Sequence, residues 1–192
     1  MTAERLRVLV TRRWPDAAEQ YLAERYDVTL NAEDAAMSPA QLAQAFDAYD
    51  IICPTVSDKI DAGVIGSAPR RTRLLANFGV GFDHIDIAAC KTANIAVTNT
   101  PGVLTDATAD LAMALILTAA RRTGEGEREL RDGRWSGWRP THLMGRSLSG
   151  KTLGLVGFGR IAQATAHRAH HGFGMNILYY SRSAAAQDIE KK

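Results

Sequence analysis

Short apolar runs alternate with amphipathic stretches along the first hundred residues. The segments LRVLVT (6–11) and RLLAN (73–77) are apolar at successive positions, which is typical of strands buried on both faces. The same pattern predicts strands at 27–30, 50–54 and 95–98. Helices are expected between them, at 15–25, 38–48 and 85–92. This alternation predicts an α/β fold, a parallel sheet covered by helices.

The pattern is interrupted at Pro101-Gly102 and then resumes. The longest helix is expected over 105–122, with Thr105 or Asp106 as its N-cap. A polar, arginine-rich segment follows to about residue 134. A strand, a helix and a second strand are then expected at 152–157, 160–170 and 176–180. We therefore expect two domains, 1–100 and 101–192.

Composition excludes several classes of protein. Hydrophobic residues make up 46% and charged residues 23% of the chain, as in ordinary globular proteins, and a net charge of +2 does not suggest a nucleic-acid surface. Cys53 and Cys90 lie in apolar stretches without metal-ligand spacing, so we expect buried thiols and no metal. The N-terminus lacks a signal-peptide core and the run 111–120 is too short to span a bilayer. The expectation is a cytoplasmic protein with no membrane partner.

The segment GLVGFGRIA (154–162) is a candidate dinucleotide-binding turn. It follows a predicted strand and opens a predicted helix, the context that the GxGxxG/A pattern needs. Gly157 permits the turn and Gly159 lets the backbone approach a phosphate. The amides around Phe158, Arg160 and Ile161 would then face a pyrophosphate at the helix N-terminus. The alternative is a plain strand–turn–helix unit with small residues.

No Asp or Glu stands at the end of the second strand of this unit, where an acidic residue usually binds the ribose 2′-hydroxyl. Ser181, Arg182 and Ser183 occupy that place instead. A guanidinium can pair with a 2′-phosphate, so we predict a preference for NADP over NAD, with NAD remaining a possible cofactor. The alternative is that Arg182 is a solvated loop residue.

A second glycine-rich turn, NFGVGFDHID (77–86), also joins a strand to a helix. Glycines flank Val80, so the amides of Val80 and Gly81 are candidates for binding a carboxylate. A turn without any ligand is the alternative interpretation.

Together these segments resemble the D-isomer-specific 2-hydroxyacid dehydrogenase family. The resemblance is carried by NFGVGFDHID, by NTPGVLTDATADLAMALIL (99–117), by RWSGWRP (134–140) and by GKTLGLVGFGRIAQ (150–163), and it covers essentially the whole chain. YYSRS (179–183) further resembles the NADP-preferring glyoxylate/hydroxypyruvate reductase branch.

The resemblance implies a flavodoxin-like substrate domain within 1–100 and an incomplete Rossmann domain within 101–192. It implies that the Val80 and Gly81 amides hold the carboxylate of a small 2-keto or 2-hydroxy acid and that Thr108 approaches the cofactor phosphates. It also implies a homodimer embraced by the arm at about 121–140, which gives Trp135 and Trp138 an interface or domain-packing role. Ordinary core packing is the alternative for these tryptophans.

The family's catalytic Arg, carboxylate and His are implied to lie beyond the residues given, so we expect no catalytic residue in this chain. His84 is expected to have a loop-surface or capping role, and His167, His170 and His171 are expected to face solvent. The chain is expected to be part of a longer enzyme and to self-associate through unpaired sheet edges. A split-gene product or a non-catalytic dinucleotide-binding module are the alternatives.

Overall fold

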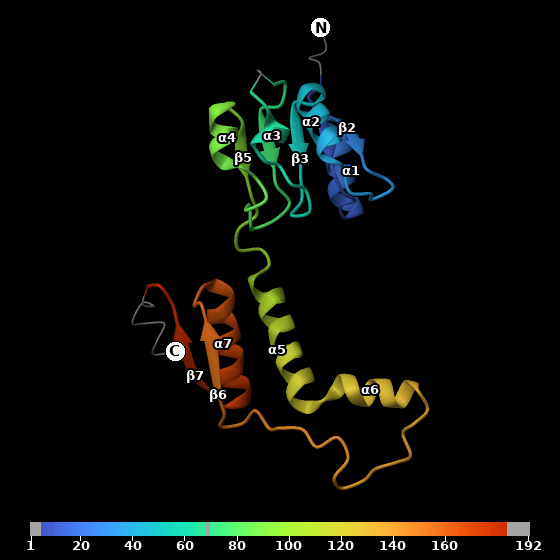
Figure 1. Ribbon diagram of the computed structural model, residues 1–192, viewed down its shortest axis with the longest axis vertical. Helices are drawn as coiled ribbons and strands as arrows, with labels where there is room; N and C mark the ends of the chain where they lie inside the picture. The colour runs from blue at the N-terminus through green and yellow to red at the C-terminus, as the bar shows by residue number, and fades with distance from the viewer. Residues whose placement is uncertain (1–4, 68–69, 184–192) are drawn as a thin grey trace. The chain divides into compact units, whose positions relative to one another are not determined.

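The computed structural model describes residues 5–67 and 70–183 (Figure 1). The chain divides into two compact units, Met1–Pro101 and Gly102–Lys192. Each unit is described by itself.

The first unit is built on a five-stranded sheet. Its strands are β1 (Arg7–Val10), β2 (Asp27–Leu30), β3 (Ile51–Cys53), β4 (Leu74–Ala76) and β5 (Ala96–Thr98). They lie in the order β2-β1-β3-β4-β5, and every pairing is parallel. The predicted α/β class is confirmed. In this order β1 has β2 on one side and β3 on the other, which makes the β1/β3 boundary a topological switch point.

Helices cover the two faces of this sheet unequally. The larger core, centred on Phe46, Ile52 and Leu75, packs α2 (Pro39–Ala48), α3 (Ala62–Ile65) and α4 (Ile87–Thr92) against one face. The smaller core consists of Val8, Val10 and Cys53 and is contacted by Leu22 of α1 (Asp16–Arg25). The helix α2 begins where predicted because Ser38 and Gln41 form a capping box.

The second unit contains α5 (Thr105–Arg121), α6 (Thr123–Arg131), β6 (Thr152–Val156), α7 (Arg160–Phe173) and β7 (Asn176–Tyr180). The strands β6 and β7 are parallel neighbours. Helices α5 and α7 lie side by side (Figure 1), with Met113, Ala169 and Met175 as the buried centre of their contact. Arg168 of α7 ties the two helices together by ion pairs with Asp110 (2.6 Å) and Asp106 (3.0 Å).

One local expectation was wrong, and two helices were not predicted. Leu104, and neither Thr105 nor Asp106, occupies the N-cap of α5, and no side chain caps this helix. The arginine-rich segment after α5 is helical as α6, which is supported by ion pairs of Arg122 with Glu125 and of Arg131 with Glu127. The short helix α3, capped by Asp61, was not predicted.

The two-stranded sheet has one apolar face that no described residue covers. Leu153, Leu155 and Ile177 are half-buried, whereas Val156, Leu178 and Tyr180 on the opposite face are 94%, 67% and 72% exposed. Parallel sheets are normally covered on both faces, so this face is unusual for its class.

Both cysteines are free and buried. Burial raises the pKa of the Cys53 thiol to about 12, and burial is also the main cause of a raised pKa at Cys90. Within the described ranges, none of the helices has the length and apolar character needed to cross a bilayer.

Candidate functional site

The turn that carries Val80 and Gly81 is held by side-chain amides. The Nδ2 group of Asn77 donates to the carbonyls of Gly79 (3.2 Å) and Gly81 (3.0 Å). The Nδ2 group of Asn99 donates to the carbonyl of Val80 at 2.8 Å. The carbonyls of residues 79–81 therefore all accept hydrogen bonds, and their orientation is fixed by buried or half-buried side chains.

The same arrangement leaves backbone donors available. Throughout the described ranges, no acceptor is found for the N–H groups of Val80 and Gly81. A Cβ atom built on Gly81 would meet nothing within 4 Å, so its backbone can be approached closely. At Gly79 the reverse holds, because a Cβ there would lie 2.9 Å from Val56 Cγ1. Fixed carbonyls and free amides are the properties of an anion-binding turn.

His84 contacts Asn77, one of the two side chains that hold this turn. Its Nε2 lies 3.0 Å from Asn77 Oδ1. Since Asn77 uses its NH2 group on two carbonyls, its oxygen must accept, and His84 Nε2 carries the proton. Burial lowers the pKa of His84, against the opposing attraction of Asp58 and Asp83. His84 therefore orients the side chain of Asn77 through this hydrogen bond.

The carboxyl ends of β1, β3 and β4 meet beside this turn. Asp58 is buried there and accepts from Thr11 Oγ1 (2.5 Å) and from the Thr55 amide (2.8 Å). Trp14 packs on Phe78 with ring centroids 4.9 Å apart. None of these residues was predicted to belong to a site, although polar residues directly after predicted strands were a usable signal.

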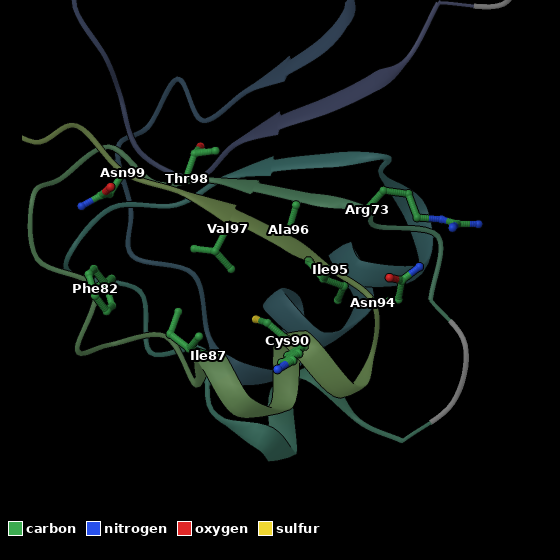
Figure 2. Close-up of a pocket in the computed structure, with 11 residues that line it drawn as sticks. Arg73, Phe82, Ile87, Cys90, Asn94, Ile95, Ala96, Val97, Thr98 and Asn99 are labelled. Atoms are coloured by element: carbon green, nitrogen blue, oxygen red, sulfur yellow. The ribbon is translucent and has the colours of Figure 1, made fainter.

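A cavity of about 560 Å³ lies on the outer side of β5 and α4 (Figure 2). Ile87, Cys90, Ile95 and Val97 give it an apolar floor, and Arg73 stands at the end opposite Phe82 and Asn99. It reaches the glycine turn only through Phe82 and Asn99 and contains no pair of acid and base groups. We therefore place the candidate substrate site at the turn and not in this cavity.

In the second unit, the glycine turn joins β6 to α7. Gly157 has a φ of +91°, which favours glycine, and its N–H donates to the Tyr180 carbonyl at 2.7 Å. Gly159 is the N-cap of α7, and no side chain caps this helix end. A Cβ built on Gly159 would meet nothing within 4 Å. The first amides of α7, including those of Arg160 and Ile161, are thus open to an anion.

Two further contacts hold the glycine turn in place. The ring of Phe158 stacks on Tyr179 of β7, with centroids 4.1 Å apart and an interplanar angle of 14°. Gln163 Nε2 donates to the Phe158 carbonyl at 2.9 Å. These contacts fix the turn against the adjacent strand and the first turns of its helix. The backbone has the form that a dinucleotide pyrophosphate requires, and the residues fit that group.

The remaining residues predicted for the cofactor lie on α5 and directly after β7. Thr108 is half-buried in the first turn of α5, the helix that Arg168 ties to α7. Ser181, Arg182 and Ser183 directly follow β7, with Arg182 exposed. In the second unit, the bond between the Gly157 N–H and the Tyr180 carbonyl places the glycine turn beside the end of β7, while Val80 and Gly81 belong to the first unit.

The family model of the D-isomer-specific 2-hydroxyacid dehydrogenase catalytic domain matches residues 8–190. The glyoxylate reductase of Thermococcus litoralis is 44% identical over 96% of this chain and 56% of its own length. The glycerate dehydrogenase of Hyphomicrobium methylovorum is 39% identical over 96% of this chain and 57% of its own length.

Solved structures show the same likeness. A protein of Polaromonas sp. described as a D-isomer-specific 2-hydroxyacid dehydrogenase superposes with a TM-score of 0.90 at 38% identity, covering 97% of this chain and 58% of that chain. A glyoxylate reductase from Paecilomyes thermophila superposes with a TM-score of 0.78 at 27% identity, covering 100% of this chain and 59% of that chain. The chain spans a little over half the length of the relatives it matches.

Proposed function

Because the chain belongs to the D-isomer-specific 2-hydroxyacid dehydrogenase family, we propose that it serves in the NADPH-dependent reduction of a small 2-keto acid, glyoxylate or hydroxypyruvate. The observation that carries the proposal is the clamped turn in the first unit. Among the described residues, the N–H groups of Val80 and Gly81 have no acceptor, while the carbonyls of 79–81 are held by side-chain amides. Such a turn binds a carboxylate, the group common to all 2-keto and 2-hydroxy acids.

In the proposed mechanism, this chain supplies binding and orientation. The Val80 and Gly81 amides hold the substrate carboxylate. The amides from Phe158 to Ile161 receive the pyrophosphate, and Thr108 assists at the phosphates. When bound, the dinucleotide supplies the hydride that reduces the carbonyl carbon. We assign no acid–base residue in this chain, since His84 is engaged with Asn77.

The preference for NADPH is proposed from the end of β7. Arg182 is exposed there between two serines, and no described residue of 176–183 is acidic. A guanidinium and two hydroxyls suit a 2′-phosphate, which a carboxylate at this place would repel. NADH is the weaker cofactor in this proposal.

Titration of the chain with NADPH and NADH, followed by the fluorescence of the reduced nicotinamide, tests the proposal. We expect NADPH to bind about tenfold more tightly, about 1.4 kcal/mol. Arg182→Ala should remove that preference and leave NADH binding unchanged. The exposed Arg128 of α6 provides a matched control, and Arg128→Ala should keep the preference. Tighter binding of NADH to the unaltered chain would contradict the proposal.

We further propose that the chain forms a homodimer through the arm at 121–140. Trp135 and Trp138 are both exposed in the single chain, which does not fit the alternative of ordinary core packing. Large exposed aromatic side chains are typical of the centre of an interface.

A further inference from the structure

Three histidines lie together on the last turns of α7, away from the glycine turn at its other end. His167, His170 and His171 have the spacing i, i+3 and i+4, which places them on one face of a helix. The ring centroids of His167 and His171 are 4.3 Å apart, and those of His170 and His171 are 4.9 Å apart. Neither the proposed substrate site nor the proposed cofactor site uses them.

His170 differs from the other two in its hydrogen bonding. Its Nδ1 lies 2.9 Å from the carbonyl oxygen of Met175. A carbonyl only accepts, so Nδ1 donates and the ring is held in one tautomer. His167 and His171 are exposed, and no hydrogen-bond partner for their ring nitrogens is found in the described part of the chain. Two imidazoles with free lone pairs thus stand one helical turn apart.

We propose that His167 and His171 form a surface site for a divalent transition metal. Histidines at i and i+4 of a helix can ligate one metal ion together, and imidazole suits Cu²⁺, Ni²⁺ and Zn²⁺. Within the described residues, no three His, Cys, Asp or Glu side chains converge as a complete metal centre. The site therefore takes two protein ligands, and water completes the coordination.

The position on the helix favours a cation. The site lies on the last two turns of α7, which ends at Phe173 with Gly174 as its C-cap, and the C-terminal end of a helix carries partial negative charge. A metal ion that bridges His167 and His171 would link two successive turns. Binding therefore stabilises the folded form, and the affinity order should be Cu²⁺ above Ni²⁺ and Zn²⁺.

Calorimetric titration of the untagged chain with NiCl2 and CuCl2 tests the site. We expect one ion per chain and tighter binding of Cu²⁺. His167→Ala and His171→Ala should each weaken Ni²⁺ binding at least about tenfold, while His170→Ala keeps it.

A rearranged variant separates spacing from histidine content. His171→Ala combined with Gly172→His keeps the number of histidines but moves one to i+5, and a Cβ at Gly172 meets nothing within 4 Å. This variant should lose Ni²⁺ binding as His171→Ala does. An unaltered chain that binds no Ni²⁺, or binding retained when the pair is removed or respaced, would overturn the proposal. Circular dichroism establishes that each variant is folded, and dinucleotide binding is measured separately.

Discussion

Leu75 and Leu178 both lie on parallel strands, yet Leu75 is fully buried and Leu178 is 67% exposed. Leu75 belongs to the five-stranded sheet, where α2, α3 and α4 close one face. Leu178 belongs to β7, whose inner face packs on the α5–α7 pair while its outer face has no cover among the described residues. Apolar residues on both faces of a strand thus indicate that both faces of the sheet need to be packed. They do not identify which segment packs against each face.

The largest expected effect comes from replacing the two leucines by the same residue. Leu75→Ala should lower the free energy of unfolding by about 2–5 kcal/mol, because it leaves a cavity in a closed core. Leu178→Ala should change it by about 0.5 kcal/mol or less, because the side chain already contacts solvent. Urea unfolding of the first and second units measures both. Equal losses at the two positions would show that β7 is covered in solution.

Self-association provides the second test of this comparison. The exposed face formed by Val156, Leu178 and Tyr180 favours association with any apolar surface. Leu178→Lys should lower the constant for association beyond the arm-mediated dimer at least about tenfold, since a charge must then be desolvated. Sedimentation velocity over a range of concentrations measures it. Lys91→Ala, a surface change in the first unit, is the control and should leave association unaltered.

The smallest expected effect concerns the turn of the first unit. Asn99→Ala removes the donor to the Val80 carbonyl and should weaken oxalate binding by about threefold to tenfold, since one hydrogen bond contributes about 0.5–1.5 kcal/mol. Thr92→Ala, on the exposed side of α4, should leave oxalate binding unchanged. Titration followed by NMR chemical shifts of the Val80 and Gly81 amides reports both affinity and place. Shifts confined to other residues would contradict the assignment.

The sequence predicted those elements whose signals are local. The α2 start is encoded by Ser38 and Gln41, and the turn before α7 by Gly157 and Gly159, so both were placed correctly. The helix α6 was missed because Gly124 and Gly126 lower helix propensity, while its support comes from ion pairs along the helix. The hydrophobic pattern of the sequence does not show whether these ion pairs outweigh the low helix propensity of the two glycines.

The candidate substrate site could be predicted only in part, because some of its contacts are not local in the sequence. The glycine-rich turn 77–86 is visible in the sequence, but its hydrogen bonds join it to Asn99, nineteen positions from Val80. That contact exists because β4 and β5 are neighbours, and strand order cannot be obtained from a local pattern. The role of His84 likewise depends on which oxygen its ring faces.

The two buried cysteines have a practical consequence for spectroscopy. Cys53 and Cys90 are the only cysteines of the chain, and burial keeps both as protonated thiols at neutral pH. Thiol reagents such as maleimides attack the thiolate, so the native protein should take up label slowly. A cysteine introduced at an exposed position then becomes a single reactive handle. A donor and an acceptor attached to two such cysteines, one in each unit, would report the separation between the units by energy transfer without first removing a native residue.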